Sequence, residues 1–415
     1  MKKIYVIIGV ILLAAIAWAG WFYYQNLRGI KPIVTQAPVD IAEIIDSQAT
    51  TATSTNATDF PLKLPAGFKI EVLAKDLSGA RDLELDGRGN LWVSRTGQGI
   101  VSQVLLRDGQ FVAQADSYKG LNRPHGLAVD PSDPLELYIA EETKLSKVRL
   151  FAGETLQKIT DLPQAGRHFT RSLVFGADGR LYISIGSSCD TCYEKDERLA
   201  AISVMNKDGS DQQVLAKGLR NSVFMAAFQG TEQIWATEMG RDFLGDDLPP
   251  DEINIIPDFE APRPGSGQNT APPDFGWPIC YGQNVHDSVF DKNQYIQDPC
   301  QDKIPAAIDL PAHSAPLGIT FIPPNSAWPK DYWYNAIVAF HGSWNRSQPT
   351  GYKLVRFKLD AQGNFQGSED FISGWLTAKD QSLGRPVDVL AQADGSLFVS
   401  DDKAGLVYKV SYQAQ

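Results

Sequence analysis

The sequence has few of the residues that mark several protein classes. Among its 415 residues there are only 5 His, 4 Cys and 4 Met. Its 38 basic side chains are outnumbered by 49 acidic ones, which gives a net charge of −11 at pH 7. An acidic chain without a long basic run binds nucleic acid poorly, because it repels the phosphate backbone. We therefore expect no nucleic-acid partner.

The cysteines exclude some metal and haem sites. The CxxC motif at Cys189 and Cys192 is followed by Tyr193 rather than His, which excludes c-type haem attachment there. No cluster of Cys and His has zinc spacing, and no D-x-D-x-D-G run marks an EF-hand. Outside the cytoplasm, Cys189–Cys192 and Cys280–Cys300 would be two structural disulfides. A redox role for the CxxC pair is the less favoured interpretation.

The N-terminus carries one long apolar segment. Lys2 and Lys3 precede an uncharged run over residues 4–24, which is long enough to span a bilayer as a helix. We predict that residues 1–29 form a membrane anchor, so that the body is periplasmic or otherwise extracytoplasmic and tethered to the inner membrane. The alternative is a cleavable signal segment, since residues 17–19 have the small-x-small form, and the protein would then be secreted.

Residues 30–60 are predicted to be a flexible, disordered tether. The stretch QATTATSTNATD over residues 48–59 is low-complexity and lacks large apolar side chains. Such a segment cannot bury enough surface to offset the entropy lost on ordering. We expect it to separate the N-terminal segment from a folded domain over residues 61–415.

The folded part is a series of repeated hairpins. With 35 Gly and 25 Pro spread along the chain, many short strands are favoured over long helices. Each repeat has an alternating strand, a turn rich in Asp, Gly, Asn or Pro, and an aliphatic-aromatic strand. Six copies begin at Leu83, Leu127, Leu173, Met225, Gly318 and Asp388.

The spacing of the repeats predicts the architecture. The early starts lie 44, 46 and 52 residues apart, near the size of a propeller blade, whereas the later intervals of 93 and 70 residues require inserted loops, mainly over residues 240–312. The predicted fold class is all-β, a six-bladed β-propeller in which blades cover each other's apolar faces. A two-sheet β-sandwich or two smaller β domains are the alternatives.

Polar residues at equivalent blade entries are candidates for chemistry. His125, His168 and His313 precede the second, third and fifth hairpins, so all three should face one channel mouth. A histidine there can take a proton near neutral pH, although each could instead cap a turn. Arg220, before the fourth hairpin, and Arg385, before the sixth, could bind an anionic planar ligand or simply be solvated.

The inserted loop begins with an acidic run. Residues 238–254 combine several carboxylates with Gly and Pro. Such a loop can offer carboxylate and carbonyl oxygens to a hard cation such as Ca²⁺. A solvated acidic loop is the alternative.

Seven segments occur in the order and blade positions of one family. Together they resemble the soluble sugar dehydrogenases that depend on pyrroloquinoline quinone (PQQ), including the aldose and sorbosone dehydrogenase-like branch, over residues 62–410. The segments are LPAGF (64–68), GLAVDP (126–131), HFTRSL (168–173), GLRN (218–221), DEIN (251–254), FGWP (275–278) and GRPVD (384–388).

The resemblance implies an activity and a cofactor. It implies an oxidoreductase that uses PQQ and Ca²⁺ to oxidise the anomeric hydroxyl of a sugar, or an aldehyde hydrate, by hydride transfer to the quinone. His168 matches the base that takes the hydroxyl proton. Arg220 and Asn221 match the pair that contacts the quinone, with Arg220 placed to stabilise charge developing on its oxygen. Electrons would leave to a quinone or a cytochrome.

Other residues match the family's cofactor and metal contacts. Arg385 matches an arginine that binds a cofactor carboxylate, and Arg346 is the cation nearest to a family lysine position. His125 occupies a loop in which the family offers a glutamine. For calcium, the implied ligands are the backbone carbonyls at Gly240 and Arg241 for a catalytic ion, and Glu252 with the Phe275 carbonyl for a structural ion.

One departure from the family concerns the base. The aspartate that orients the family's histidine falls at Ser187 here, which carries no charge, and Asp190 is the nearest possible replacement. Two further hypotheses therefore stay open. The protein could be a calcium-dependent propeller lactonase or other hydrolase, or a non-catalytic propeller that binds carbohydrate.

Overall fold

The residues in the turns fix where the hairpins form. The turn between the first two strands of the first blade is an example. Asp86 Oδ1 accepts hydrogen bonds from the backbone N–H groups of Arg88 and Asn90, at 2.8 and 3.0 Å. Gly89 completes the turn with φ of +76°, a conformation that glycine adopts without strain. All six predicted hairpins occur in the computed structural model, each as the inner pair of a larger sheet.

The structure describes residues 2–22, 35–36, 54–153, 155–164, 166–231, 233–257, 271–324 and 326–413. Within this part, antiparallel sheets follow one another as blades. The first three blades are β4 (Ala80–Leu85), β5 (Leu91–Arg95), β6 (Ile100–Arg107) and β7 (Gln110–Lys119); β8 (Leu127–Asp130), β9 (Asp133–Ala140), β10 (Lys144–Arg149) and β11 (Gln157–Asp161); and β12 (Arg171–Phe175), β13 (Leu181–Ile185), β14 (Ala201–Met205) and β15 (Gln213–Lys217).

The last three blades have the same inner-to-outer order. They are β16 (Ser222–Ala227), β17 (Ile234–Glu238), β18 (Asp251–Ile256) and β21 (Ile308–Leu310); β22 (Pro316–Phe321), β23 (Ala336–Phe340), β24 (Lys353–Leu359) and β25 (Phe365–Ile372); and β27 (Pro386–Ala391), β28 (Leu397–Asp401), β29 (Leu406–Tyr412), β3 (Phe68–Ala74) and β2 (Thr55–Ala57). Short 3₁₀ turns occupy Thr96–Gln98 and Lys330–Tyr332.

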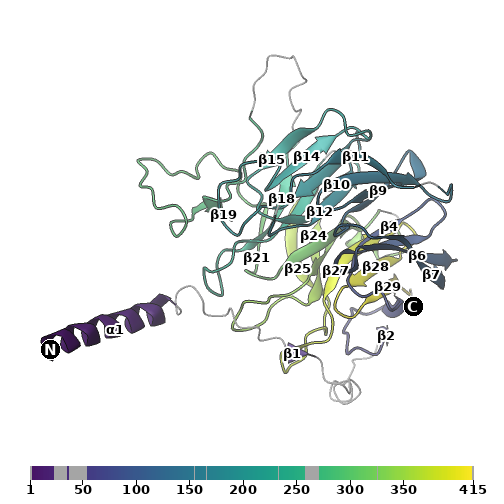
Figure 1. Cartoon of the computed structure of the whole chain (residues 1–415). Helices are drawn as coiled ribbons and strands as arrows, with labels where there is room; N and C mark the ends of the chain where they lie inside the picture. The colour runs from purple at the N-terminus through teal and green to yellow at the C-terminus, as the bar shows by residue number, and fades with distance from the viewer. Residues whose placement is uncertain are drawn as a thin grey trace.

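The blades close into a ring. The innermost strands contact one another in the cyclic order β4, β8, β12, β16, β22, β27 and back to β4. The last blade lies beside the first, as the yellow and dark-blue strands of Figure 1 show. The N-terminal strand β3 pairs antiparallel with β29, so the two ends of the domain share one sheet. This arrangement confirms the predicted all-β six-bladed propeller.

The core lies between the blades. The described residues form six buried apolar clusters, and each joins two neighbouring blades around the ring. One cluster joins the fifth and last blades, where Phe68 of β3 packs edge-on against Trp328 and Phe371 at centroid distances of 4.7 and 5.1 Å. Apolar burial between blades, rather than within one sheet, therefore holds the ring together.

The long insertion contains more structure than a loop. Strands β18 and β21 of the fourth blade lie within the predicted range 240–312, and between them a small hairpin pairs β19 (Cys280–Tyr281) with β20 (Val285–His286). The predicted disulfide Cys280–Cys300 closes the segment that contains this hairpin. Figure 1 shows this segment standing out from the blades around the label β19.

The predictions for the N-terminal residues, a membrane anchor and a tether, are not confirmed in the way that the propeller is. Helix α1 spans Lys2–Phe22. In the described part of the chain, no helix combines the length and apolar character that crossing a membrane requires. The membrane anchor predicted for residues 1–29 is therefore unsupported. Most of the predicted tether, residues 30–34 and 37–53, lies outside the described residues.

The described parts of the predicted tether form two strands. Strand β1 (Thr35–Gln36) pairs with β26 (Gln381–Ser382), and β2 pairs with β3. Asn56 then fixes the chain that follows β2, because its Nδ2 donates to the Phe60 carbonyl at 2.6 Å. The ordered domain therefore begins several residues before position 61.

We expect that replacing Phe68 with Ala weakens ring closure. The side chain is 2% exposed and contacts several aromatic rings, so its loss removes buried area and leaves a cavity. The free energy of unfolding should fall by about 3–5 kcal/mol, measured by urea denaturation. Phe111→Ala is the control, because Phe111 is 44% exposed and its loss should change stability by less than about 0.5 kcal/mol. Equal effects of the two substitutions would contradict this role of β3.

Candidate functional site

A polar cavity lies at one end of the channel. In an antiparallel blade the innermost strand begins, and the second strand ends, at the same edge. Loops before β12, β16, β22 and β27 and loops after β17 and β23 therefore gather at that end, and they enclose a cavity of about 350 Å³. Its lining includes Arg167, His168, Arg220, Gly240, Asp242, Asp251, His313, His341, Trp344, Asn345 and Arg385.

Contacts with Ser187, in the third blade, hold His168 in place. Its Nδ1 lies 2.8 Å from Ser187 Oγ, and its backbone N–H donates to the Ser187 carbonyl at 3.3 Å. A Cβ at Gly186 would lie 2.6 Å from the His168 Cβ, so only glycine allows this approach. Burial, together with the charges of Arg220 and Arg167, lowers the pKa of His168 to about 3. The imidazole is therefore neutral near pH 7.

Arg220 is almost fully buried and multiply bonded. Its Nη2 donates to Asp190 Oδ1 at 2.6 Å and its Nε to the Asp190 carbonyl at 2.9 Å, while Nη1 donates to the Met239 carbonyl. Burial raises the pKa of the Asp190 carboxyl, but the Arg220 guanidinium and the accepted hydrogen bonds outweigh it and lower the pKa below its usual value. Asp190 thus orients Arg220. The Nδ1 contact of His168 is to Ser187 rather than to Asp190, although the Asp190 charge acts on the ring and raises its pKa.

Arg385 and His341 form the opposite wall. Arg385 donates to the carbonyls of His341 and Gly342, and His341 Nε2 lies 3.0 Å from Asp402 Oδ1. Burial, reinforced by Arg385, lowers the pKa of His341 to about 4. A Cβ at Gly342, where φ is +101°, would lie 2.5 Å from a neighbouring tyrosine ring, so the chain turns there only because this residue is glycine.

His341 was not among the sequence candidates. It follows the second strand of its blade, whereas the candidate histidines were chosen because they precede a first strand. The signal that could have found it is the antiparallel blade itself, since both positions lie at one end. Asp242 lies after β17, inside the acidic run 238–254 that the sequence offered as a possible cation loop; in the structure it accepts a hydrogen bond from Arg167 at 2.5 Å.

Two predicted cofactor residues lie away from this cavity. His125 is fully buried, with Nδ1 3.3 Å from the Arg171 carbonyl and its ring 5.1 Å from that of Phe224. Arg346 donates to the backbone carbonyls of Asp246 and Ala312. Neither side chain is part of the cavity lining.

Asn221 lies just beneath the cavity floor. It is 3% exposed, and its Oδ1 accepts a hydrogen bond from Thr170 Oγ1 at 3.4 Å. A Cβ at Gly186 would lie 2.6 Å from that same oxygen. The structure therefore brings together His168, His313, Arg220 and Arg385, with Asn221 immediately behind them.

The four predicted metal residues surround one small cavity. Gly240, Arg241, Glu252 and Phe275 all line an enclosed space of about 30 Å³, together with Glu238. Glu238 and Glu252 are register partners on β17 and β18, so their side chains lie next to each other. Burial raises the pKa of Glu238 to about 8 and that of Glu252 to about 7. Two buried carboxyls beside carbonyl-bearing loops are a donor set that suits a hard cation.

A second grouping of possible metal ligands does not qualify. Cys189, Cys192 and Glu194 bring their ligand atoms close together, but the two sulfur atoms form a disulfide. Their thiolates are therefore not available to a metal ion. Both predicted disulfides are thus present.

The fold and the site define a class, namely six-bladed propellers with a basic and histidine-rich cavity at one channel mouth. The sequence model of the TrAA12-like family matches residues 62–413, which is nearly the whole propeller. The chain belongs to the TrAA12-like family.

Known sequences extend this relationship. An uncharacterised protein of Borreliella burgdorferi is 29% identical over 373 residues, covering 85% of this chain and 91% of its own length. A pyrroloquinoline quinone-dependent pyranose dehydrogenase of Coprinopsis cinerea is 23% identical over 424 residues, covering 84% of this chain. The chain spans only about half, 54%, of that Coprinopsis protein.

Solved structures share the fold. The holo PQQ domain of the Coprinopsis cinerea pyranose dehydrogenase superposes with a TM-score of 0.72 at 21% identity, covering 86% of this chain and 100% of the domain. A calcium structure of a Trichoderma reesei family AA12 enzyme gives 0.71 at 18% identity, covering 87% of this chain and 100% of that one. The apo aldose sugar dehydrogenase of Escherichia coli gives 0.59 at 17% identity, covering 83% and 99%.

We expect stability in metal-free solution to fall as pH rises from about 4.5 through about 8. Over this range the folded chain keeps protons on Glu238 and Glu252 that the unfolded chain releases near the ordinary carboxyl pKa, so rising pH favours unfolding. Urea denaturation in a chelator, from about pH 5 to about pH 9, checks this. Glu238→Gln should flatten the pH dependence. A wild-type profile in Glu238→Gln would contradict the assignment.

Proposed function

We propose that the protein is a PQQ-dependent sugar dehydrogenase. The observation that carries the proposal is the cavity in which neutral His168 faces Arg220 and Arg385. Membership of the TrAA12-like family supports it, as do relatives that are PQQ-dependent dehydrogenases. The proposed reaction removes a hydride and a proton from the anomeric carbon and hydroxyl of a sugar, or from an aldehyde hydrate.

The residues present fit the cofactor. PQQ is a planar tricyclic tricarboxylate, and three arginines, Arg167, Arg220 and Arg385, line a cavity of about 350 Å³. Guanidinium groups bind carboxylates through charge-assisted hydrogen bonds. The buried Asn345 Oδ1 has no partner among the described residues, which leaves an unused acceptor in the same wall. These arginines would hold the anionic groups of the cofactor.

The chain's own residues would divide the work as follows. When bound, PQQ supplies an electrophilic quinone carbon that accepts the hydride. His168 would take the hydroxyl proton as the hydride leaves, since its ring is neutral and its Nδ1 contact fixes the ring. Arg220, oriented by Asp190, stabilises negative charge that develops on the acceptor oxygen.

Calcium is proposed at the two places that the resemblance implied. The carbonyls of Gly240 and Arg241 would bind one ion, at the border of the two cavities that Gly240 lines. Glu252 and the Phe275 carbonyl would bind another in the small cavity, where Glu238 adds a second carboxyl. A divalent ion there would compensate the burial of two carboxyl groups, which supports the assignment.

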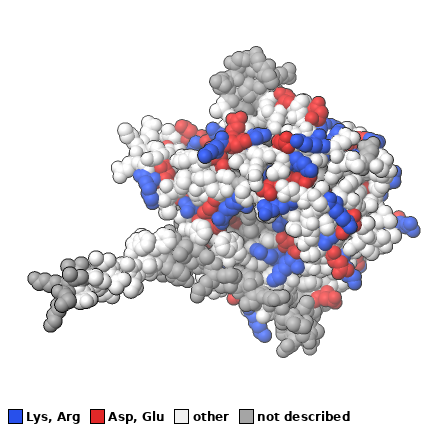
Figure 2. Space-filling view, in the orientation of Figure 1, with Lys and Arg blue, Asp and Glu red and all other residues white. Residues whose placement is uncertain are grey.

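The setting of the reaction is also proposed. The disulfides Cys189–Cys192 and Cys280–Cys300 support an oxidising, extracytoplasmic compartment. The proposed electron acceptor is a separate quinone or cytochrome, because the sequence has no haem attachment motif. On the face shown in Figure 2, Lys and Arg are interspersed with Asp and Glu, the pattern of a solvated surface rather than of a nucleic-acid groove.

Reconstitution tests the proposal. The full chain, stripped of metal, is titrated with PQQ in the presence and absence of Ca²⁺, and a panel of aldoses is then added. Stoichiometric, Ca²⁺-dependent binding followed by sugar-dependent bleaching of the quinone absorbance is expected. His168→Gln should bind PQQ normally but lower kcat by about 10²–10⁴-fold. His286→Gln, outside the cavity and paired with Asp291, is the matched control. Lactone hydrolysis by PQQ-free protein, without any sugar oxidation, would overturn the proposal.

Arg385 should contribute to cofactor affinity. Arg385→Gln removes a cation from the cavity wall, and we expect the Kd for PQQ to rise about 30-fold, equivalent to about 2 kcal/mol. Arg107→Gln, at an exposed strand end, is the control of equal charge change. Fluorescence or absorbance titration measures both. An unchanged Kd in Arg385→Gln would exclude this residue from the cofactor site.

A further inference from the structure

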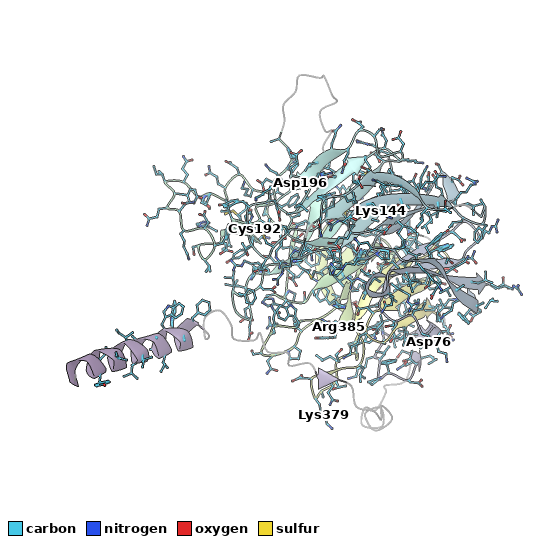
Figure 3. All side chains as sticks on the ribbon, in the orientation of Figure 1. Asp76, Lys144, Cys192, Asp196, Lys379 and Arg385 are labelled. Atoms are coloured by element: carbon cyan, nitrogen blue, oxygen red, sulfur yellow. A yellow bond between two sulfur atoms is a disulfide. The ribbon has the colours of Figure 1, made fainter. Side chains whose placement is uncertain are left out.

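The loop closed by the Cys189–Cys192 disulfide touches both main groups of the cavity. Ser187, just before it, has its hydroxyl 2.8 Å from His168 Nδ1 and donates to the Cys189 carbonyl at 2.6 Å. Asp190, inside it, accepts two hydrogen bonds from Arg220. In Figure 3, Cys192 and Arg385 are labelled and come from loops of different blades. One short covalent loop thus supports the proposed base and the proposed charge stabiliser together.

The donor inventory fixes the direction of these hydrogen bonds. A serine hydroxyl has one hydrogen, and the Cys189 carbonyl can only accept, so the Ser187 hydrogen points to that carbonyl. Ser187 Oγ can then only accept from His168 Nδ1. The neutral imidazole must therefore carry its proton on Nδ1, which leaves the lone pair on Nε2. Within the described residues nothing hydrogen-bonds to that Nε2.

We propose that Ser187 and the backbone carbonyl of Cys189, held in place by the Cys189–Cys192 disulfide, form a relay that selects the reactive tautomer of His168. Ser187 is a positioning residue, and it does with a neutral hydroxyl what the resemblance assigns to an aspartate. The inference rests on the proposed dehydrogenase function for its kinetic consequence, but the tautomer itself is a property of the protein alone.

Several further contacts hold the members of the relay in place. Ser187 is fully buried, and its backbone N–H donates to the Arg220 carbonyl at 2.7 Å. The neighbouring Ser188 is tied back by Glu194, which accepts from its backbone N–H at 2.6 Å and from its hydroxyl at 2.8 Å. The position of the Cys189 carbonyl is thus defined on both sides, by the disulfide and by the Glu194 carboxylate.

The disulfide is reachable by a reductant. Cys189 and Cys192 are partly exposed, and Cys192 borders a surface cavity of about 430 Å³ together with Tyr193 and Phe290. Cys280 and Cys300 are almost fully buried. Mild dithiol treatment should therefore reduce Cys189–Cys192 first, and reduction frees the loop that carries the carbonyl and Asp190.

The first test reads the tautomer directly. Imidazole nitrogen spectra of the full chain, recorded without cofactor and assigned with His168→Gln, should show His168 protonated on Nδ1. Ser187→Ala should move the proton toward Nε2, the tautomer that an unconstrained histidine side chain prefers, whereas Ser187→Asp should keep it on Nδ1. Ser210→Ala, in an exposed turn of the same blade where its hydroxyl bonds Asp208, is the matched control. An Nδ1-protonated His168 in Ser187→Ala would overturn the proposal.

The second test reads the kinetic consequence. Ser187→Ala should lower kcat for the sugar by about 10–100-fold with little change in KM, as expected when only the base is misplaced. Ser187→Asp should recover most of that loss. The double variant Cys189→Ser/Cys192→Ser should also lose activity, and mild reduction of the wild type should mimic it. Urea denaturation of the Cys189→Ser/Cys192→Ser variant controls for a general loss of stability. Full kcat in Ser187→Ala would overturn the relay.

The two proposals fail separately. A wild-type protein that binds PQQ but oxidises no sugar would refute the dehydrogenase function, and the nitrogen spectra would still decide the relay. If Ser187→Ala misfolds, as judged by circular dichroism, the cysteine variants carry the test. A wild-type tautomer in Cys189→Ser/Cys192→Ser would refute the role of the disulfide.

Discussion

Packing between blades is the constraint on which the rest of this structure depends. Each blade has two apolar faces, and six buried clusters cover them only because every blade has a neighbour on both sides. An open row of blades would leave two faces exposed to water, at a cost of about 25 cal/mol for each Å². A buried cluster between the last and first blades covers those two faces, and β3 completes the last sheet by pairing with β29.

Ring closure also creates the site. No blade could form the cavity alone, because its lining comes from four blades that are distant in sequence. The innermost strands β12, β16 and β27 are mostly buried, and the loops that enter them place His168, Arg220 and Arg385 around one opening. Stability and site geometry thus have the same origin, and the loops are free to vary in chemistry without disturbing the ring.

The sequence predicted what local chemistry determines. Turn residues and alternation located all six hairpins, and blade-entry positions located His168, His313, Arg220 and Arg385. Side-chain direction was not predictable. His125 also precedes an inner strand, yet it packs against Phe224 in the core. His341 was missed because it follows a second strand, and only the closed blade shows that both positions share one end.

Around His168, orienting the ring is separated from stabilising its positive charge, two tasks that one carboxylate could perform together. Orientation comes from Ser187, which is neutral, while the nearest carboxylate, Asp190, is committed to Arg220. An anionic partner for the ring would stabilise the imidazolium and raise the pKa of His168. Here burial and the charges of two arginines outweigh that of Asp190 and keep the ring neutral. Ser187 is thus compatible with His168 acting as a base, because a neutral hydroxyl is enough to keep the ring proton on Nδ1.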